Sequence, residues 1–244
     1  MTTAAIVFAY LGGLGFVAVA VALSVRRRRV HPLLLVCVAA ISISWIEAPY
    51  DGAVYAQFPK AIPRMPAWWP LNKTWGGLPA PVPPGYIAYF VLPAVIGAFI
   101  GRRLVARFGW RRPVTLLTTG LVSGFAWALF FNGLIGAHYG VFYYGRVIHG
   151  LALFEGTKRQ YPLYDALAMG VQVMVFSYLL GSNVIARWAE TKRHPSAMAV
   201  AAFIVIGHAT YLGVFAPHLV TKVSGLVDAG PNTQLFPGVP NQPK

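Results

Sequence analysis

Two carboxylates mark the end of an apolar segment early in the chain. Glu47 and Asp51 lie four residues apart in SWIEAPYDGAVYAQ, directly after the apolar run LLLVCVAAISI, although the whole chain has only six acidic residues. This spacing would place both side chains on one helical face. Pro49 lies between them, however, and it removes a backbone donor and disfavours helix at the residue before it. We therefore expect the helix to end or bend near Pro49, with Asp51 turned over its end.

Such a pair of carboxyl groups is suited to acid–base chemistry. A carboxyl group at the edge of hydrocarbon loses hydration, which favours its protonated form, and a second carboxylate nearby strengthens that preference. One carboxyl can then act as a general acid while the other acts as a base. We expect Glu47, the deeper of the two, to be the acid. The alternative interpretation is structural: a polar helix end whose acids pair with Lys60, Arg64 or Arg146.

A third carboxylate, Asp165, opens a later apolar segment and could join the same site. It would also suit the positive end of a helix dipole, so a purely structural role stays open. Aromatic and polar residues near the acids or within apolar segments are candidates for substrate contacts, although each of them could also serve packing or the interfacial aromatic belt. These candidates are Trp45, Tyr50, Tyr55, Arg64, Asn132, Tyr161, Tyr164 and His208.

Motifs for cofactor or metal chemistry are not apparent. The sequence contains no P-loop, dinucleotide fingerprint or zincin motif. Cys37 is the single cysteine, and the spacing of His138, His149 and Glu155 matches no metal site. We therefore expect a protein without a cofactor or a metal.

The composition is that of a membrane protein. Of the 244 residues, 57% are hydrophobic and only 11% are charged, whereas soluble domains carry roughly 25% charged residues. The apolar runs predict an all-α bundle of six transmembrane helices, forming one domain over residues 1–220, with a flexible tail over 221–244. The expected helices span about 3–25, 31–48, 85–107, 113–135, 161–187 and 196–219.

Basic residues predict how this bundle is oriented. Although the net charge is +14, the basic residues lie between apolar runs, which indicates contact with the bilayer rather than with nucleic acid. Twelve of the twenty fall in short alternate connections next to helix ends, where the positive-inside bias is strongest. We therefore expect a multi-pass protein of the cell membrane with both termini outside the cytoplasm. The Pro- and Trp-rich segment 49–84 would then be a long outer loop that could cover a site.

Two sequence blocks resemble a known family. WIEAPYDGAVYAQFP, from Trp45 to Pro59, and YPLYD, from Tyr161 to Asp165, are similar to segments of the AveC-like spirocyclases, a family of membrane proteins. The resemblance implies cofactor-free closure of a dihydroxy-ketone polyketide into a spiroketal. The catalytic roles of Glu47, Asp51 and Asp165 are expected from their chemistry, not from the family.

The resemblance leaves the substrate open, since sites vary on one scaffold. We expect a hydrophobic small molecule that reaches the site from the bilayer, and a related cyclisation or dehydration of a lipid-like substrate is equally compatible. Two interpretations from other classes remain: a non-catalytic membrane subunit that binds or passes a lipid, and a small proton-coupled transporter. The sequence predicts no oligomeric state.

Overall fold

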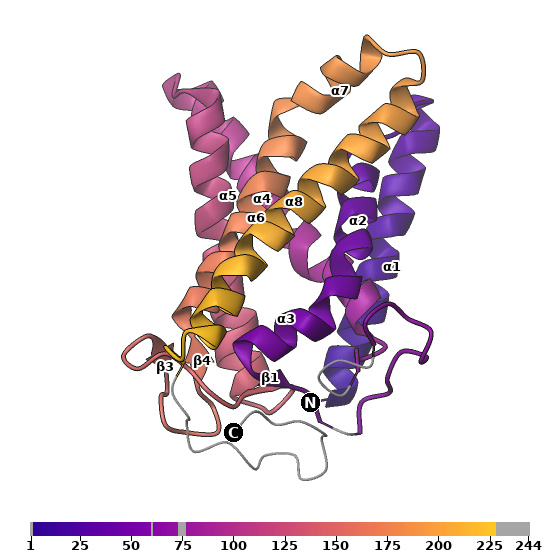
Figure 1. Cartoon of the computed structure of the whole chain (residues 1–244). Helices are drawn as coiled ribbons and strands as arrows, with labels where there is room; N and C mark the ends of the chain where they lie inside the picture. Colours follow the sequence, from indigo (N-terminus) through magenta and orange to yellow (C-terminus); the bar gives the residue numbers. More distant parts are fainter. Residues whose placement is uncertain (1, 60, 73–76, 228–244) are drawn as a thin grey trace.

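Six long apolar helices run side by side in this protein (Figure 1). The computed structural model describes residues 2–59, 61–72 and 77–227. Each of the six helices is long and apolar enough to cross a membrane. The expected all-α, multi-pass membrane fold is therefore confirmed. The spans are Thr3–Arg27, Pro32–Val54, Val82–Phe108, Arg112–Ala137, Leu163–Ser182 and Pro195–Val223.

Several spans are built from more than one element, and short strands join the loops. The helices are α1 (Thr2–Arg27), α2 (Pro32–Ile43), the 3₁₀-helix η1 (Ser44–Ile46), α3 (Glu47–Val54), α4 (Val82–Phe108), α5 (Arg112–Ala128), the π-helix η3 (Leu129–Ala137), α6 (Leu163–Ser182), α7 (Val184–Glu190) and α8 (Pro195–Val223). The strands are β1 (Ala56–Gln57), β2 (Tyr143–Tyr144), β3 (Ala152–Leu153) and β4 (Tyr161–Pro162).

The second span bends before Pro49 rather than at it. The α-helix α2 gives way to η1, and α3 then starts at Glu47 and runs at an angle to α2 (Figure 1). The expected bend near Pro49 is present, but it lies at Ser44–Ile46, and Pro49 itself lies in the first turn of α3, where its missing N–H is not needed. Tyr55 ends α3 with a left-handed backbone conformation, φ 56°. The bend thus sets Glu47 and Asp51 on a separate short helix.

Two other spans also depart from the predicted helices. The fourth span changes from α-helix to π-helix at Leu129, and this wider form extends to Ala137. The helix expected over 161–187 is divided, because α6 ends at Ser182 and Asn183 takes a left-handed conformation, φ 56°, before α7. Asn132 interrupts the apolar pattern in the first place and Gly181 to Asn183 in the second, and asparagine tolerates the left-handed conformation, but neither boundary was expected from the sequence.

Glycines bring α4, α5 and α6 into close contact. A Cβ atom at Gly120 of α5 would lie 2.6 Å from the Cβ of Ser177 on α6. A Cβ atom at Gly97 of α4 would lie 2.9 Å from the Cα of Gly120. Small residues allow membrane helices to approach in this way, and van der Waals packing then stabilises the contact.

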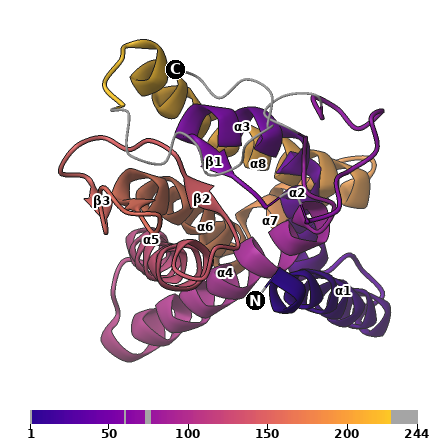
Figure 2. The ribbon, with the colours of Figure 1, turned by 90° about the horizontal axis from the view of Figure 1, so that it is seen from below.

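The loops on one end of the bundle are tied together by two antiparallel strand pairs. Ala56 pairs with Tyr144 in the β1–β2 ladder, and Leu153 pairs with Tyr161 in the β3–β4 ladder. Figure 2 shows this end, with β1 beside α3 and β2 below it. We call it the loop end. The β1–β2 pair connects segments that are far apart in the sequence, whereas β3–β4 is a local pairing next to the start of α6.

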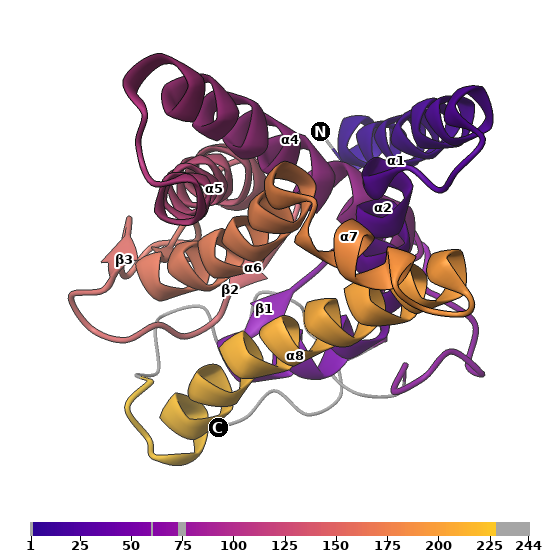
Figure 3. The ribbon, with the colours of Figure 1, turned by 90° about the horizontal axis from the view of Figure 1, so that it is seen from above.

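The opposite end of the bundle carries the short connections 28–31, 109–111 and 191–194 (Figure 1). We call it the arginine end. Seen from this end, α4, α5 and α6 lie on one side and α1, α2 and α8 on the other, with α7 between them (Figure 3). At the loop end, α8 continues to Val223, beyond the expected domain boundary at 220. Residues 228–244, which include Asp228 and most of the predicted tail, lie outside the described residues.

Candidate active site

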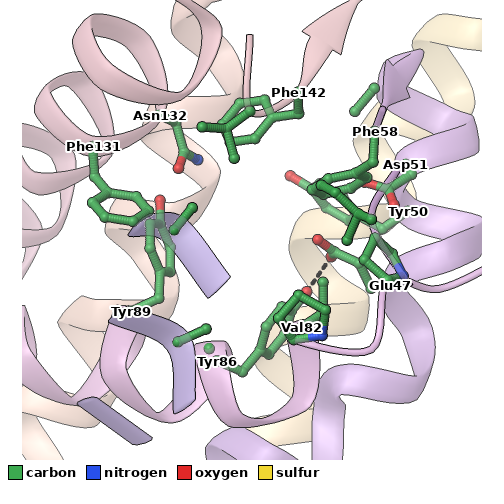
Figure 4. Close-up of a pocket in the computed structure, with 18 of the residues that line it drawn as sticks. Glu47, Tyr50, Asp51, Phe58, Val82, Tyr86, Tyr89, Phe131, Asn132 and Phe142 are labelled. Carbon is green, nitrogen blue, oxygen red and sulfur yellow. Dashed lines mark hydrogen bonds between the residues drawn. The ribbon is translucent and has the colours of Figure 1, made fainter. Parts of the chain in front are cut away.

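A pocket at the loop end contains all three carboxylates that the sequence suggested. Glu47, Asp51 and Asp165 line it together, and so do Tyr50 and Asn132 from the predicted substrate contacts. The pocket measures about 950 Å³ when the space open to its surroundings is included. Its remaining lining is largely apolar and comes from α1, α4, the π-helix and the loop after β1. Figure 4 shows Glu47, Tyr50 and Asp51 across the pocket from Tyr89 and Asn132.

Glu47 is held by two tyrosine hydroxyls from other spans. Tyr86 of α4 donates a hydrogen bond to its Oε2 atom (Figure 4), and Tyr211 of α8 donates to the same oxygen at 2.9 Å. The two hydroxyl oxygens are also in contact, and because each carries one proton, a hydroxyl that donates to the other cannot at the same time donate to Glu47. Both hydroxyls contact the same oxygen, Oε2. The other oxygen, Oε1, accepts no hydrogen bond from the described residues. Three helices therefore fix the position of Glu47 while one oxygen remains available.

Asp165 accepts hydrogen bonds from two tyrosines, one on each of its oxygens. Tyr50 of α3 donates to Oδ1 at 2.7 Å, and Tyr144 of β2 donates to Oδ2 at 2.8 Å. Asp165 is only 2% exposed. Burial, and then the charge of Asp165, raise the pKa of Tyr144 well above its ordinary value, so this hydroxyl stays protonated as a donor. Asp165 thus joins the start of α6 to α3 and to the loop strands.

Asp51 differs from the other two carboxylates. It is buried, and its carboxylate accepts no hydrogen bond from any residue that the structure describes. The guanidinium of Arg64 acts on it through its charge but makes no salt bridge with it. Arg64 instead donates to the backbone carbonyls of Phe58, at 3.0 Å, and Gly77, at 3.2 Å. Arg64 therefore stabilises the loop between α3 and α4, and the alternative in which it pairs with the acids is not what the structure shows.

The π-helix shapes the wall opposite the carboxylates. Phe131 and Asn132 both line the pocket, and π-helical turns often occur at functional sites because they reorient side chains. The hydroxyl of Tyr89 is buried and points toward the side chain of Asn132, with which it interacts, although the described residues give it no hydrogen bond of good geometry (Figure 4). This wall therefore offers a buried polar group that a ligand oxygen could reach.

An aromatic contact closes the pocket on the side of α1. The rings of Phe8 on α1 and Phe131 on the π-helix lie 5.1 Å apart, and both residues line the pocket. The apolar side chains Val7, Leu11 and Leu14 on the outer surface of α1 are exposed, as expected for a helix that faces lipid. This wall is thus a single helix thick, with the bilayer beyond it.

The structure places Trp45 and His208 together, but they are not among the residues that line the pocket. Trp45 donates from Nε1 to Nε2 of His208 at 3.0 Å, while Nδ1 of His208 lies 2.9 Å from the carbonyl oxygen of Ile204. Both ring nitrogens are therefore satisfied when Nδ1 carries the proton. The pair joins η1 to the middle of α8.

The other predicted substrate contacts also lie beyond the pocket lining. Tyr55 contacts two cations through its ring, with Arg146 at 5.2 Å and Lys222 at 4.7 Å from the centroid. Tyr161 is fully buried and packs on Tyr144, with ring centroids 5.4 Å apart. Tyr164 packs against His218 at 5.6 Å. These tyrosines and Arg64 support the elements that carry the site.

Sequence reasoning missed the tyrosines that hold the acids. Tyr86 and Tyr211 were not predicted, although Tyr211 lies one helical turn after His208. Tyr211, Phe215 and His218 share one face of α8, and all three rings pack against Tyr50. These three residues are spaced by four and three positions, which places them on one helical face, and this spacing could have indicated from the sequence that they act together. Within the described residues, no group of three or more His, Cys, Asp or Glu side chains is arranged to hold a metal ion.

Comparison with known families identifies the family of this chain. The family model described as Spirocyclase AveC-like matches residues 25–242. The chain belongs to the AveC-like spirocyclase family. Neither a curated protein nor a solved structure matches the chain.

The pocket of this spirocyclase-family chain combines three chemical features. Glu47 and Asp51 both line it, tyrosine hydroxyls anchor two of the three carboxylates, and the rest of the lining is mostly apolar. An enclosed apolar pocket strengthens electrostatic interactions and keeps water from competing. The arrangement can therefore transfer a proton to one oxygen of a ligand and remove a proton from another.

Proposed function

We propose that this protein is a membrane-embedded cyclase that needs no cofactor. It converts a hydrophobic dihydroxy ketone, or the hemiketal derived from it, into a spiroketal with loss of water; a related cyclisation or dehydration would use the same groups. One observation carries the proposal: Glu47, Asp51 and Asp165, from two distant parts of the chain, line a single apolar pocket. Family membership supports the same class of reaction.

The proposed reaction needs one acid and one base. Addition of the first hydroxyl to the ketone gives a hemiketal, and Glu47 protonates its hydroxyl oxygen, which leaves as water. The resulting oxocarbenium ion is attacked by the second hydroxyl, whose proton passes to Asp51. Return of that proton from Asp51 to Glu47 restores the starting state, so the net change is the loss of one water molecule. A positioned acid or base contributes typically 10²- to 10⁴-fold in rate.

Hydrogen bonding favours Asp51 over Asp165 as the base. Each oxygen of Asp165 already accepts from a tyrosine, Tyr50 or Tyr144, so a substrate hydroxyl would have to compete with these donors. Asp51 has no such donors among the described residues. In this proposal Asp165 is a positioning residue, because it fixes Tyr50 on the short helix that also carries Glu47 and Asp51.

Access from the bilayer suits a hydrophobic substrate. The rings of Phe8 and Phe131 close the gap between α1 and the π-helix. Exposed apolar side chains of α1, which would face lipid, lie beyond this contact. Separation of these rings would connect the pocket to the hydrocarbon. Tyr89 and Asn132 would then bind oxygens of a substrate that has passed this contact.

We also propose that the pocket faces the extracytoplasmic side. The short arginine-rich connections gather at the arginine end, away from the pocket, and such connections are retained in the cytoplasm. Both the start of α1 and the end of α8 lie at the loop end (Figure 1), so both termini would be external. Reporter fusions after Arg112 and after Pro59 should therefore report cytoplasmic and external locations.

Comparison of lipophilic metabolites tests the function. Cells that lack the gene are complemented with the wild type or with Asp51→Asn, and extracts are analysed by mass spectrometry. We expect a compound in the wild-type extract whose precursor, heavier by one water, accumulates with Asp51→Asn. A non-catalytic lipid-binding subunit would change amounts without this mass relation, and identical extracts would contradict the cyclase proposal.

A further inference from the structure

A second cavity lies at the arginine end, away from the carboxylates. It measures about 1710 Å³ when the space open to its surroundings is included. Its walls come from α1, α2, α4, α6, α7 and α8, and from the start of α5. Figure 3 shows α7 between the two groups of helices at this end. We call it the arginine cavity.

The charge of the arginine cavity is strongly positive. Five arginines line it against one carboxylate, that of Glu190. None of them forms a salt bridge with a carboxylate in the part of the chain that the structure describes. The five are Arg27, Arg29, Arg102, Arg112 and Arg187. The positive-inside bias explains why arginines gather at this end, but not why these five surround a cavity.

Two of the arginines are fixed at the end of α6. Arg112 donates to the carbonyl oxygen of Gly181 at 2.6 Å, and Arg187 donates to that of Ser182 at 3.5 Å. The helices α2, α5 and α8 begin at the cavity and α1, α6 and α7 end at it, so their dipoles offset one another and the arginines supply the positive charge. Burial, and then the charges of Arg27 and Arg29, lower the pKa of His31 in the cavity wall. The positive charge of the cavity therefore favours binding of an anion.

The floor of the cavity is apolar. Leu23, Leu35, Val95 and Leu180 belong to its lining. Val95 precedes Arg102 by two turns of α4, which places it about 10 Å deeper along the helix. A small hydrated anion would leave this apolar part unused, whereas an amphiphile with a charged head and a hydrocarbon chain would contact both parts.

We propose that the arginine cavity binds an anionic phospholipid, with its phosphate among the arginines and part of an acyl chain against the apolar floor. Basic pockets between membrane helices are suited to such headgroups, and guanidinium groups match phosphate geometry in a bidentate manner. The site is separate from the catalytic pocket and does not depend on the cyclase proposal. Bound lipid would stabilise the bundle where α7 joins its two groups of helices.

The test compares two double variants with equal changes in charge. Arg27→Gln with Arg102→Gln removes two cavity arginines, whereas Arg26→Gln with Arg103→Gln removes their sequence neighbours, which do not line the cavity. The full-length protein is purified in detergent, and binding of phosphatidylglycerol, phosphatidylcholine and inorganic phosphate is measured by native mass spectrometry. At about fivefold in affinity per arginine, the cavity variant, which lacks two, should bind phosphatidylglycerol roughly 25-fold more weakly.

The proposal predicts that the wild type and the Arg26/Arg103 variant bind phosphatidylglycerol alike and prefer it to phosphatidylcholine. Equal loss in both double variants would show general surface attraction and overturn the assignment. Displacement of the lipid by millimolar inorganic phosphate would identify a soluble anion as the ligand and would also overturn it. If the cavity variant is poorly folded, Ala186→Phe adds bulk to the cavity without changing its charge and should weaken lipid binding; unchanged binding would contradict the site.

Discussion

Replacement of Glu47 by Gln is the perturbation that separates acid catalysis from structural support. The Oε2 atom of Glu47 accepts from Tyr86 and Tyr211, and the amide oxygen of Gln can accept the same two bonds. The amide nitrogen then replaces the oxygen that no described residue contacts. A net hydrogen bond contributes about 1 kcal/mol, and neither bond is lost, so the change in unfolding free energy should stay below about 1 kcal/mol.

Catalysis should respond much more strongly than stability. Gln cannot give a proton to the departing hydroxyl, so turnover should fall by about 10²-fold or more. Turnover is measured per folded molecule in lipid nanodiscs, with folded protein counted by size-exclusion chromatography and thermal unfolding. Glu155→Gln is the matched control, because Glu155 lies in an exposed loop where it pairs with His149 at 2.5 Å.

Two results would refute this reasoning. Near-normal turnover in Glu47→Gln would remove Glu47 from the proton transfer. A loss of activity that only follows the loss of folded protein would make Glu47 a structural anchor for α4 and α8. An equal loss in Glu155→Gln would show that the assay reports general damage.

Three further predictions follow from individual contacts. Tyr211→Phe removes one donor to Glu47, so we expect about 1 kcal/mol lower unfolding free energy and reduced turnover. Gly120→Ala should lower the thermal midpoint because its Cβ would meet Ser177, whereas Gly213→Ala should be tolerated because nothing lies within 4 Å. The lowered pKa of His31 means that the unfolded chain binds its proton more readily, so stability should fall as pH drops below about 6.5. His31→Asn keeps a capping side chain, and thermal unfolding between pH 5 and 7.5 should show a flatter acid dependence than in the wild type.

The six spans could be predicted because their physical signal is local. A run of about 20 apolar residues has few alternatives to a membrane-spanning helix, whatever it packs against. The 3₁₀ turn at Ser44–Ile46 could not be predicted in this way. Its residues are as apolar as those before it, and it is the packing of α3 across the bundle that fixes the bend. Pro49 gave a misleading boundary because a proline also fits the first turn of a new helix.

The carboxylates of the site were predictable, but their partners were not. An acid at the end of an apolar helix is rare enough in this sequence to attract attention. A tyrosine in such a helix is common, since it also serves packing and the interfacial belt. The roles of Tyr86 and Tyr211 depend on how α4 and α8 turn toward α3, which is a tertiary property. His208 was a reasonable candidate because a polar side chain within an apolar helix is costly. The rotation of α8, however, directs it to Trp45.

The most direct measurement uses the purified protein in nanodiscs with a synthetic hydrophobic dihydroxy ketone. Chiral chromatography with mass spectrometry follows the rate of water loss and the configuration at the spiro carbon. The account predicts faster formation of one spiroketal stereoisomer than in empty nanodiscs, with the acceleration lost in Glu47→Gln and retained in Glu155→Gln. The same rate and the same mixture of stereoisomers with and without the protein would contradict it.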